Sequence, residues 1–373
     1  MKLSCLQENL AKSLAIVGRA VATRTTLPVL SNIYMATDNG RLKLAATNLE
    51  LSIVTWVDAK VSEEGAITVP ARLLTELVSS LPNDIVSMSL NERSHTLRLS
   101  CARSDANIKG IEASEFPPIP TLSTTATIKI EPDVLRSMIS QVIFAASDNE
   151  TRPVLAGILV SFTGDKLIMA ATDGFRLSVY QLPIETQQKV DIIVPATAMK
   201  EVARLAAGIT EPIVVISEQN QILFRLPNIE LVSRLIEGTF PNYNHIIPQG
   251  HTTRSVLATT DFLNATRRAS FFAHEAANMV HLSIQKADEL TPSRVSVKAV
   301  SAEVGDTVDD VEAVIEGKSL NIGFNVLYLS EVLAVCGTSQ VGLETGTDKS
   351  PAVIRPVGQD GFLHVIMPLQ LPK

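Results

Sequence analysis

The chain has little of what marks secreted or membrane proteins. Only three of its 373 residues are cysteines, Cys5, Cys101 and Cys336, and they lie too far apart to suggest a disulfide framework or a zinc cluster. We expect them to be reduced, buried thiols. No apolar run reaches the roughly 18 residues that a membrane helix needs, and Glu8 and Lys12 interrupt the apolar stretch at the N-terminus, which excludes a signal peptide. The sequence therefore predicts a soluble cytoplasmic protein with no membrane partner.

Positive charge is also in short supply. The chain has 32 Lys and Arg against 39 Asp and Glu, which gives a net charge of −7. A protein that holds nucleic acid through its overall basicity would show the opposite balance. Any contact with DNA must therefore come from local groups of positive side chains.

Catalytic and cofactor-binding motifs are missing as well. The stretch that starts at His274 resembles a zinc-protease helix, but Asn278 occupies the position of the second histidine ligand. Residues 317–319 read Gly-Lys-Ser, like the end of a phosphate-binding loop, yet Glu312 stands where that loop needs its first glycine. No G-x-S-x-G or G-x-G-x-x-G sequence occurs. We predict no catalytic residues, no metal site and no cofactor; an enzyme whose active site is assembled from distant positions remains a rival interpretation.

The histidines give no support to that rival. They are scattered along the chain, and none lies in a motif that would activate it. We expect each of them at the surface or at a strand end. They are His95, His245, His251, His274, His281 and His364.

What the chain does contain is a repeated pattern. The phrase AATNLELS at residues 45–52 returns as AATDGFRLS at residues 170–178, and neighbouring phrases return with it. Pro28 and Pro153 hold equivalent places in them, with an offset of 153 − 28 = 125 residues. A fainter third copy keeps the same order of helix and strand patterns. One order and one offset indicate three modules, in agreement with the length of the chain. The predicted modules span residues 1–122, 123–249 and 250–373.

Each module has helix and strand periodicity of its own. Between residues 6 and 20, apolar side chains recur at helical spacing and form one apolar face. The next segment alternates around the Asp-Asn-Gly turn at 38–40, which predicts a β-hairpin. A second helix follows, and a second hairpin over residues 87–100 closes the unit. The order helix, strands, helix, strands predicts an α+β fold in which one face of each helix lies on a sheet.

Positive side chains fall on helix faces that turn away from the sheets. Five of the six predicted helices carry such a residue; in the second, Arg72 lies opposite an apolar face expected to contain Leu73, Leu77 and Leu81. The sixth, residues 325–336, has only one charge, Glu331. These side chains are either ordinary solvated surface or a diffuse basic lining for a phosphate backbone. They are Lys12, Arg19, Arg72, Lys200, Arg204 and Arg268, with Arg136 and Arg267 on the flanks of their helices.

The segment 303–316 has the opposite character. It contains several acidic residues, among them Asp306, Asp309 and Asp310, and no positive residue. A solvated strand and loop would explain this composition. A surface that receives basic groups of another subunit is the alternative.

The order of five phrases resembles one protein family. TLPVL at 26–30, AATDGFRL at 170–177, EGTFPNY at 237–243, GFNVLYL at 323–329 and VIMPLQL at 365–371 follow one another as in the bacterial DNA polymerase III beta subunit, the DNA sliding clamp. The resemblance runs from Met1 to Leu371. It implies a non-enzymatic processivity factor: a head-to-tail homodimer whose six modules close a ring, with sheets outside and helices lining a hole for duplex DNA. It also implies partners, namely an ATP-driven clamp loader, the DNA polymerase III catalytic subunit, and other polymerases and repair factors that bind through short peptide motifs.

The resemblance also implies three sets of site residues. Arg24, Asn149 and Arg152 fall where the family touches DNA, and the outward residues Arg72, Lys200, Arg204 and Arg268 join them as DNA-binding candidates. Subunit contact is expected between Phe271 and Phe272 of one copy and Leu81 and Ile108 of the next. The peptide-binding pocket between the second and third modules is expected to comprise Leu155, Thr172, Gly174, Arg176, Leu177, Pro241, Ile246, Asn325, Tyr328, Val365, Met367, Pro368 and Leu369.

Two positions depart from the family pattern. Phe175 stands where the family often has His, and Gln370 stands where it often has a basic residue. Both concern which peptide the pocket prefers. A monomeric β-rich adaptor that binds proteins without DNA remains a second rival interpretation, and it predicts neither a dimer nor retention on circular DNA.

Overall fold

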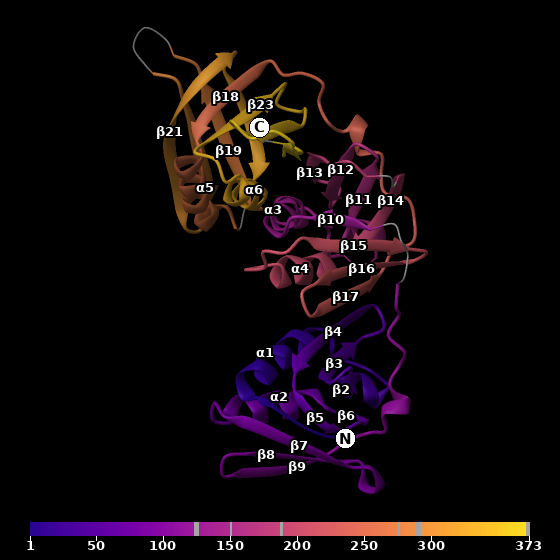
Figure 1. Cartoon of the computed structure of the whole chain (residues 1–373). Helices are drawn as coiled ribbons and strands as arrows, with labels where there is room; N and C mark the ends of the chain where they lie inside the picture. Colours follow the sequence, from indigo (N-terminus) through magenta and orange to yellow (C-terminus); the bar gives the residue numbers. More distant parts are fainter. Residues whose placement is uncertain (123–126, 150, 187–188, 275–276, 288–291, 371–373) are drawn as a thin grey trace. The chain divides into compact units, whose positions relative to one another are not determined.

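The computed structural model describes residues 1–122, 127–149, 151–186, 189–274, 277–287 and 292–370 (Figure 1). Contacts divide the chain into two compact units, one formed by Met1–Arg136 with Lys200–Leu235 and the other by Ser137–Met199 with Ile236–Lys373. Both units therefore combine segments that lie far apart in the sequence.

Helices form in the six places that the sequence predicts. Within the described residues they are α1 (Gln7–Val17), α2 (Ala71–Ser80), α3 (Pro132–Ile143), α4 (Ala196–Leu205), α5 (Thr259–Ala273) and α6 (Val326–Val335). The first begins later than expected, because Leu6 ends a strand and its side chain is exposed instead of joining the apolar face of α1. That face consists of Leu10, Leu14 and Val17, all buried.

The first unit holds two antiparallel sheets. Its strands are β1 (Lys2–Leu6), β2 (Asn32–Asp38), β3 (Arg41–Thr47), β4 (Leu51–Asp58), β5 (Lys60–Glu63), β6 (Ala66–Pro70), β7 (Ile85–Asn91), β8 (Thr96–Cys101), β9 (Ser104–Lys109), β10 (Ile128–Ile130), β15 (Ile213–Glu218), β16 (Gln221–Leu226) and β17 (Ile229–Arg234). The strand orders are β5-β1-β7-β8-β9 and β10-β15-β16-β17-β4-β3-β2-β6. The helices α1 and α2 pack against each other and on these strands (Figure 1).

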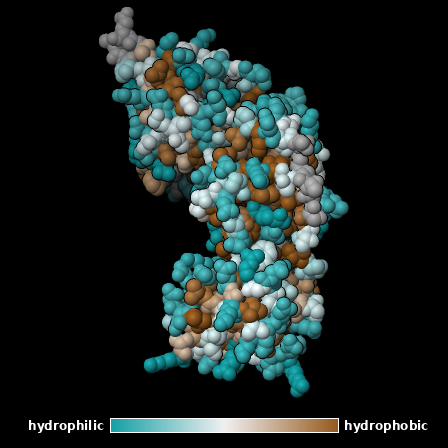
Figure 2. Space-filling model, viewed as in Figure 1, coloured by the Kyte–Doolittle hydropathy of each residue, from teal (hydrophilic) through white to brown (hydrophobic). Residues whose placement is uncertain are grey.

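The buried face of α2 differs from the predicted one. Leu74 and Val78 are fully buried, whereas Leu73, which the spacing assigns to the core, is 51 % exposed. The prediction was wrong because α2 carries two adjacent apolar stripes, and spacing alone does not tell which of them meets the sheet. Figure 2 shows apolar surface between polar atoms over the region of α1 and α2.

The predicted hairpins are confirmed. Asn39 and Gly40, between β2 and β3, both have positive φ, 50° and 77°, as a two-residue turn of type I′ requires. In the second hairpin, a short 3₁₀ turn joins β7 to β8, and the Asn91 side chain accepts a hydrogen bond from the Ser94 N–H there. Turn chemistry that is local in sequence therefore sets the register of both strand pairs.

One sheet crosses the predicted border between the first and second modules. β17 pairs with β4, with Leu231 opposite Ile53, and the Asn228 carbonyl accepts a hydrogen bond from Thr55 Oγ1 at 2.8 Å. This pairing places residues 200–235 in the first unit. The modules of the sequence are thus repeats joined by shared sheets.

The second unit contains a twelve-stranded sheet. Its strands are β11 (Gly157–Thr163), β12 (Lys166–Thr172), β13 (Arg176–Pro183), β14 (Lys189–Pro195), β18 (Thr253–Ala258), β19 (Met279–Gln285), β20 (Arg294–Ser301), β21 (Gly305–Gly317), β22 (Leu320–Asn325), β23 (Gln340–Thr345), β24 (Ala352–Pro356) and β25 (Phe362–Ile366). Their order is β14-β11-β12-β13-β25-β24-β23-β18-β21-β20-β19-β22. The pairing of β13 with β25 joins segments from the predicted second and third modules.

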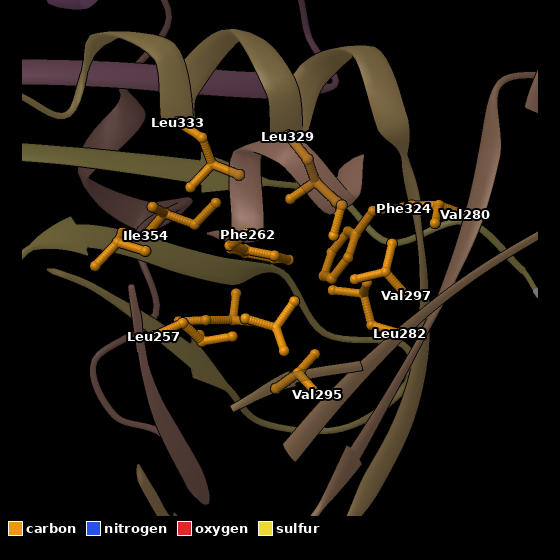
Figure 3. Packing of buried hydrophobic residues seen from close by; sticks show 14 of the residues in the cluster. Leu257, Phe262, Val280, Leu282, Val295, Val297, Phe324, Leu329, Leu333 and Ile354 are labelled. Carbon is orange, nitrogen blue, oxygen red and sulfur yellow. The ribbon is translucent and has the colours of Figure 1, made fainter. Parts of the chain in front are cut away.

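One core of this unit lies where α5 and α6 cover the strands. Figure 3 shows Phe262 of α5 and Leu329 and Leu333 of α6 pointing toward Leu282 and Val295 of the strands. All of these side chains are buried. This packing fixes α6, which carries residues of the predicted pocket.

Cys5, Cys101 and Cys336 are buried free thiols, as expected. Burial raises the pKa of Cys5 and of Cys336 to about 12. Among the described residues, no helix is both long and apolar enough to cross a membrane.

Candidate functional site

The predicted peptide pocket is built around the turn between β12 and β13. Gly174 has a φ of 95°, a conformation that favours glycine, and its N–H donates to Thr172 Oγ1 at 3.1 Å. The Asp173 carboxylate accepts from the N–H groups of Phe175 and Arg176 at 2.8 and 3.0 Å. Side chains of the turn therefore hold its own backbone, which presents Phe175 outward with 63 % exposure.

The C-terminal segment completes this site. Leu177 of β13 lies opposite Val365 of β25, and beyond the strand the Met367 N–H donates to the Phe175 carbonyl at 2.9 Å. The Leu369 N–H donates to the Gly323 carbonyl of β22 at 2.8 Å. Residues 367–369 thus run from the β12–β13 turn to the strand that leads into α6.

The apolar residues of this site fall into two groups. Leu177 and Val365 are buried in a shared core, so they form a support beneath the surface. Ile246 and Met367 are exposed and can meet a partner. Of the remaining candidates, Pro241 and Gly174 are exposed, Thr172 is buried, and Leu155, Asn325, Tyr328, Pro368 and Leu369 are half-buried. The peptide-binding role of the whole set remains a prediction.

Arg176 is held inside the protein. Its guanidinium donates to Asp173 at 3.0 Å, to Glu331 of α6 and to the Phe144 carbonyl, and it lies 4.1 Å from the centre of the Tyr328 ring. Burial and the nearby Asp173 raise the pKa of Tyr328. With its donors engaged, Arg176 joins β13 to α6 and positions the site. Sequence reasoning missed the roles of Asp173 and Glu331, although Glu331 is notable as the one charge on an otherwise apolar helix.

His364 corrects the expectation that every histidine lies at the surface or at a strand end. It is fully buried within β25, its Nδ1 is 2.7 Å from Ser178 Oγ, and its ring lies beside Phe144. Burial, with a smaller contribution from Arg176, lowers its pKa to about 3. The polarity of histidine favours an exposed position, but β25 is an apolar strand that is buried along its whole length, with one core on each face, so His364 is enclosed whichever face it takes.

The DNA-binding candidates are all exposed. Arg24 lies before the 3₁₀ turn Pro28–Ser31, and Asn149 and Arg152 lie before the matching turn Pro153–Ala156. The repeat therefore places them in equivalent loops. Arg72, Lys200, Arg204 and Arg268 project from helices, as predicted. Contact with DNA remains a prediction for each of these seven residues.

Many of the helix cations have carboxylate partners. Arg72 Nε lies 2.8 Å from Glu76, Arg204 Nε lies 2.6 Å from Glu201, and Arg268 Nη2 lies 2.8 Å from Asp309. Lys12 pairs with Glu8, and Arg136 pairs with Asp133. The hydrogen bond from Arg72 to Glu76 raises the pKa of Arg72, and that from Arg268 to Asp309 raises the pKa of Arg268. Five of the eight helix cations are thus paired with a carboxylate of the same chain.

The predicted subunit contacts differ in their availability. Phe271 is 76 % exposed, whereas Phe272 packs against the core of the second unit, as the angle of about 100° between adjacent helix residues requires. Leu81 is half-buried at the end of α2. Ile108 is only 3 % exposed, because its side chain lies on the buried face of its sheet. It can support a contact surface on β9 but offers almost no surface itself.

In the part of the chain that the structure describes, two strands, β9 and β21, each have an edge that is not paired with another strand over part or all of its length. β9 is the terminal strand of its sheet. In β21, residues 305–312 pair with β20, while the pairing with β18 begins only at Ala313, so this part has one edge without a strand partner among the described residues. Open edges of this kind are templates for pairing with another chain.

Comparisons with known proteins agree with this architecture. Family models of the DNA polymerase III beta subunit match residues 1–120 as its N-terminal domain, 129–242 as its central domain and 244–370 as its C-terminal domain. The beta sliding clamp of Synechococcus elongatus is 33 % identical over 378 residues, which cover 100 % of both chains. That of Staphylococcus aureus is 30 % identical and covers 94 % of both.

Solved structures give the same result. The sliding clamp of Bacillus subtilis superposes with a TM-score of 0.94 at 26 % identity, and that of Pseudomonas aeruginosa bound to griselimycin with 0.92 at 30 % identity; both comparisons cover 100 % of each chain. The fold is thus that of the bacterial sliding clamps, and the predicted α+β class with repeated modules is confirmed. The chain belongs to the DNA polymerase III beta subunit family. The limits 1–122, 123–249 and 250–373 remain a prediction.

Proposed function

We propose that two copies of this chain close head to tail into a ring that encircles duplex DNA in the cytoplasm and tethers DNA polymerase to its template. The observation that carries the proposal is similarity to sliding clamps over the whole length of the chain. The protein would act as an accessory subunit without catalysis or cofactor. Its partners would be the DNA polymerase III catalytic subunit, a clamp loader, and other polymerases and repair factors.

The two open strand edges support the proposed dimer. Pairing of β9 with residues 305–312 of a second copy would satisfy both edges by backbone hydrogen bonds. Charge is complementary, since Arg103 and Lys109 are exposed near β9 and Asp306, which has no ion pair among the described residues, is exposed on β21. The exposed Phe271 would add an apolar anchor. Because each copy carries one edge of each kind, two copies can close without leaving either edge free.

The charges of the helices support sliding on DNA rather than tight binding. A ring is held by topology, so it needs only weak contacts with phosphates that do not depend on sequence. The net charge of −7 and the paired cations fit this requirement.

The site at the β12–β13 turn supports the proposed tethering of partners. It combines a rigid support, Leu177 and Val365, with exposed Phe175, Ile246 and Met367. Methionine adapts to apolar groups of different shape, which suits a site that receives several partners. A short peptide with a leucine or aromatic anchor could be bound here.

The decisive experiment compares closed circular with linearised DNA after loading by a cognate clamp loader. At raised salt, phosphate contacts are weakened, so retention on circles with loss from linear ends would demonstrate topological linkage. Equal loss from both, with loader activity confirmed by a second clamp, would contradict encirclement and favour a monomeric protein-binding adaptor.

A further inference from the structure

The positively charged DNA-binding candidates fall into two classes. Arg72 and Arg204 each hold a carboxylate one turn away on their own helix, at 2.8 and 2.6 Å. Lys200 lies on the same helix as Arg204, and neither it nor Arg24 has an ion-pair partner among the described residues. The two classes do not differ in burial, because every one of these side chains is exposed. They differ in whether a carboxylate of the same chain is paired with the cation.

This pairing bears on how a phosphate can be bound. A guanidinium that donates its Nε–H to a carboxylate must give up or share that bond before it can present its planar fork to a phosphate. The carboxylate also remains beside the phosphate and repels it. A paired arginine therefore contributes less to DNA affinity than an unpaired one at the same place.

We propose that Glu76 and Glu201 limit the affinity of this clamp for DNA by occupying Arg72 and Arg204. The proposal rests on the proposed function, since it concerns the same helix surfaces. Arg24, Arg152 and Lys200, which form no ion pair within the described part of the chain, would carry the standing contact with DNA. The role of the two glutamates is thus to keep sequence-independent binding weak, which permits sliding.

Both glutamates suit this role because neither side chain has a second hydrogen-bond or ion-pair partner among the described residues. Each has one arginine as its side-chain partner. Asp309 is different: it joins α5 to β21 by pairing with Arg268, so its removal would also disturb the packing of two elements. The proposal is therefore restricted to Glu76 and Glu201.

A matched control lies in the same unit. Glu230 of β17 accepts from Arg225 Nε at 2.7 Å, much as Glu201 accepts from Arg204 Nε at 2.6 Å. The glutamate side chains are 26 % and 16 % exposed, respectively. Glu230→Gln and Glu201→Gln thus change the net charge equally, and they differ in whether the freed arginine projects from a strand or a helix.

The experiment measures binding of the full-length dimer to a short linear duplex by fluorescence anisotropy at several salt concentrations. We expect Glu201→Gln and Glu76→Gln each to bind several-fold more tightly at low salt than the parent chain. The slope of log affinity against log salt should steepen by about 0.9 for each phosphate that a freed arginine neutralises. Glu230→Gln should change the affinity by no more than about twofold and leave the salt slope unchanged, because removing this charge acts on DNA only at long range, where salt screens it.

Two results would overturn the proposal. Equal tightening by Glu230→Gln would show that net charge alone is responsible, and unchanged affinity in Glu201→Gln would show that pairing does not limit binding. Adding Arg204→Gln to Glu201→Gln should abolish the gain if the freed guanidinium is its source. Failure of the proposed function is recognised separately, because the parent chain would then not be retained on circular DNA after loading.

Discussion

At the scale of single residues, two buried polar side chains stand out, Arg176 and His364. Arg176 and His364 lie in one region, with Phe144 next to both. Arg176 is satisfied by two carboxylates and a carbonyl, whereas His364 is held by Ser178. Buried polar groups are costly unless they are hydrogen-bonded, so these contacts favour one arrangement of β13, β25 and α6, although His364 Nε2 has no hydrogen-bond partner among the described residues.

Replacing Arg176 tests this positioning role. Arg176→Ala would leave Asp173, Glu331 and the Phe144 carbonyl without their donor, so we expect a loss of about 2–3 kcal/mol, at the low end for a buried pair because Glu331 is partly exposed. Urea unfolding would measure it. Arg225→Ala, which breaks the more exposed pair with Glu230, should cost about 1 kcal/mol or less. Equal losses would contradict a special role for Arg176.

His364 predicts a pH dependence of stability. Its pKa in the folded protein is about 3, below the ordinary value of 6.5, so only the unfolded chain binds a proton at mildly acidic pH. The stability due to neutral His364 is present above pH 6.5 and is lost as pH falls toward about 3, which amounts to about 2 kcal/mol at pH 5. Urea titrations at pH 7 and pH 5 should show this loss. In His364→Gln, whose amide can still meet Ser178, the loss should be smaller by that amount; an unchanged pH dependence would refute the assignment.

At the scale of elements, the candidate pocket depends on which side chains the strands turn outward. Leu177 and Val365 are buried in one core, and the other face of β25 packs in a second core, whereas Met367 follows the end of β25 and is exposed. Ile246 lies on an irregular segment after a 3₁₀ turn. Irregular backbone therefore supplies the exposed apolar groups, and regular strands supply their support.

This division separates binding from stability. Met367→Ala with Ile246→Ala should weaken a leucine-anchored polymerase peptide by about tenfold or more in an anisotropy titration, with little change in the unfolding midpoint. Leu177→Ala, in contrast, should cost about 3 kcal/mol of stability because it creates a cavity. Unchanged peptide affinity in the first variant would exclude these residues from the site.

At the scale of the whole molecule, the proposed assembly would depend on surfaces that are incomplete in one chain. The open edges of β9 and β21 and the exposed Phe271 are unfavourable to leave in water, and a second copy would cover them. Part of the acidic segment 303–316 would serve the same proposed contact. Asp309 and Asp310 pair with Arg268 and Arg294 of their own chain, while Asp306 has no ion pair among the described residues and can meet a partner.

Substitutions at two neighbouring phenylalanines, Phe271 and Phe272, should separate effects on assembly from effects on folding. Phe271→Ala should yield monomers in sedimentation velocity experiments without loss of thermal stability of the protomer, because its side chain has little contact within the chain. Phe272→Ala should lower that stability, since Phe272 packs against the core of α5 and α6. A persistent dimer in Phe271→Ala would show that the contact lies elsewhere.

The sequence by itself determined the repeat, the α+β class and the turns. These depend on local periods and on residues such as Asn39 and Gly40, whose backbone preferences act within a few positions. Order along the chain also sufficed to indicate the family. Only the tertiary structure decided that Leu74 rather than Leu73 is buried, that Ile108 is enclosed, and that Arg204 is paired while Lys200 has no ion pair among the described residues. Burial and ion pairing depend on which distant surface packs against a side chain, and a local pattern that offers two faces does not contain that information.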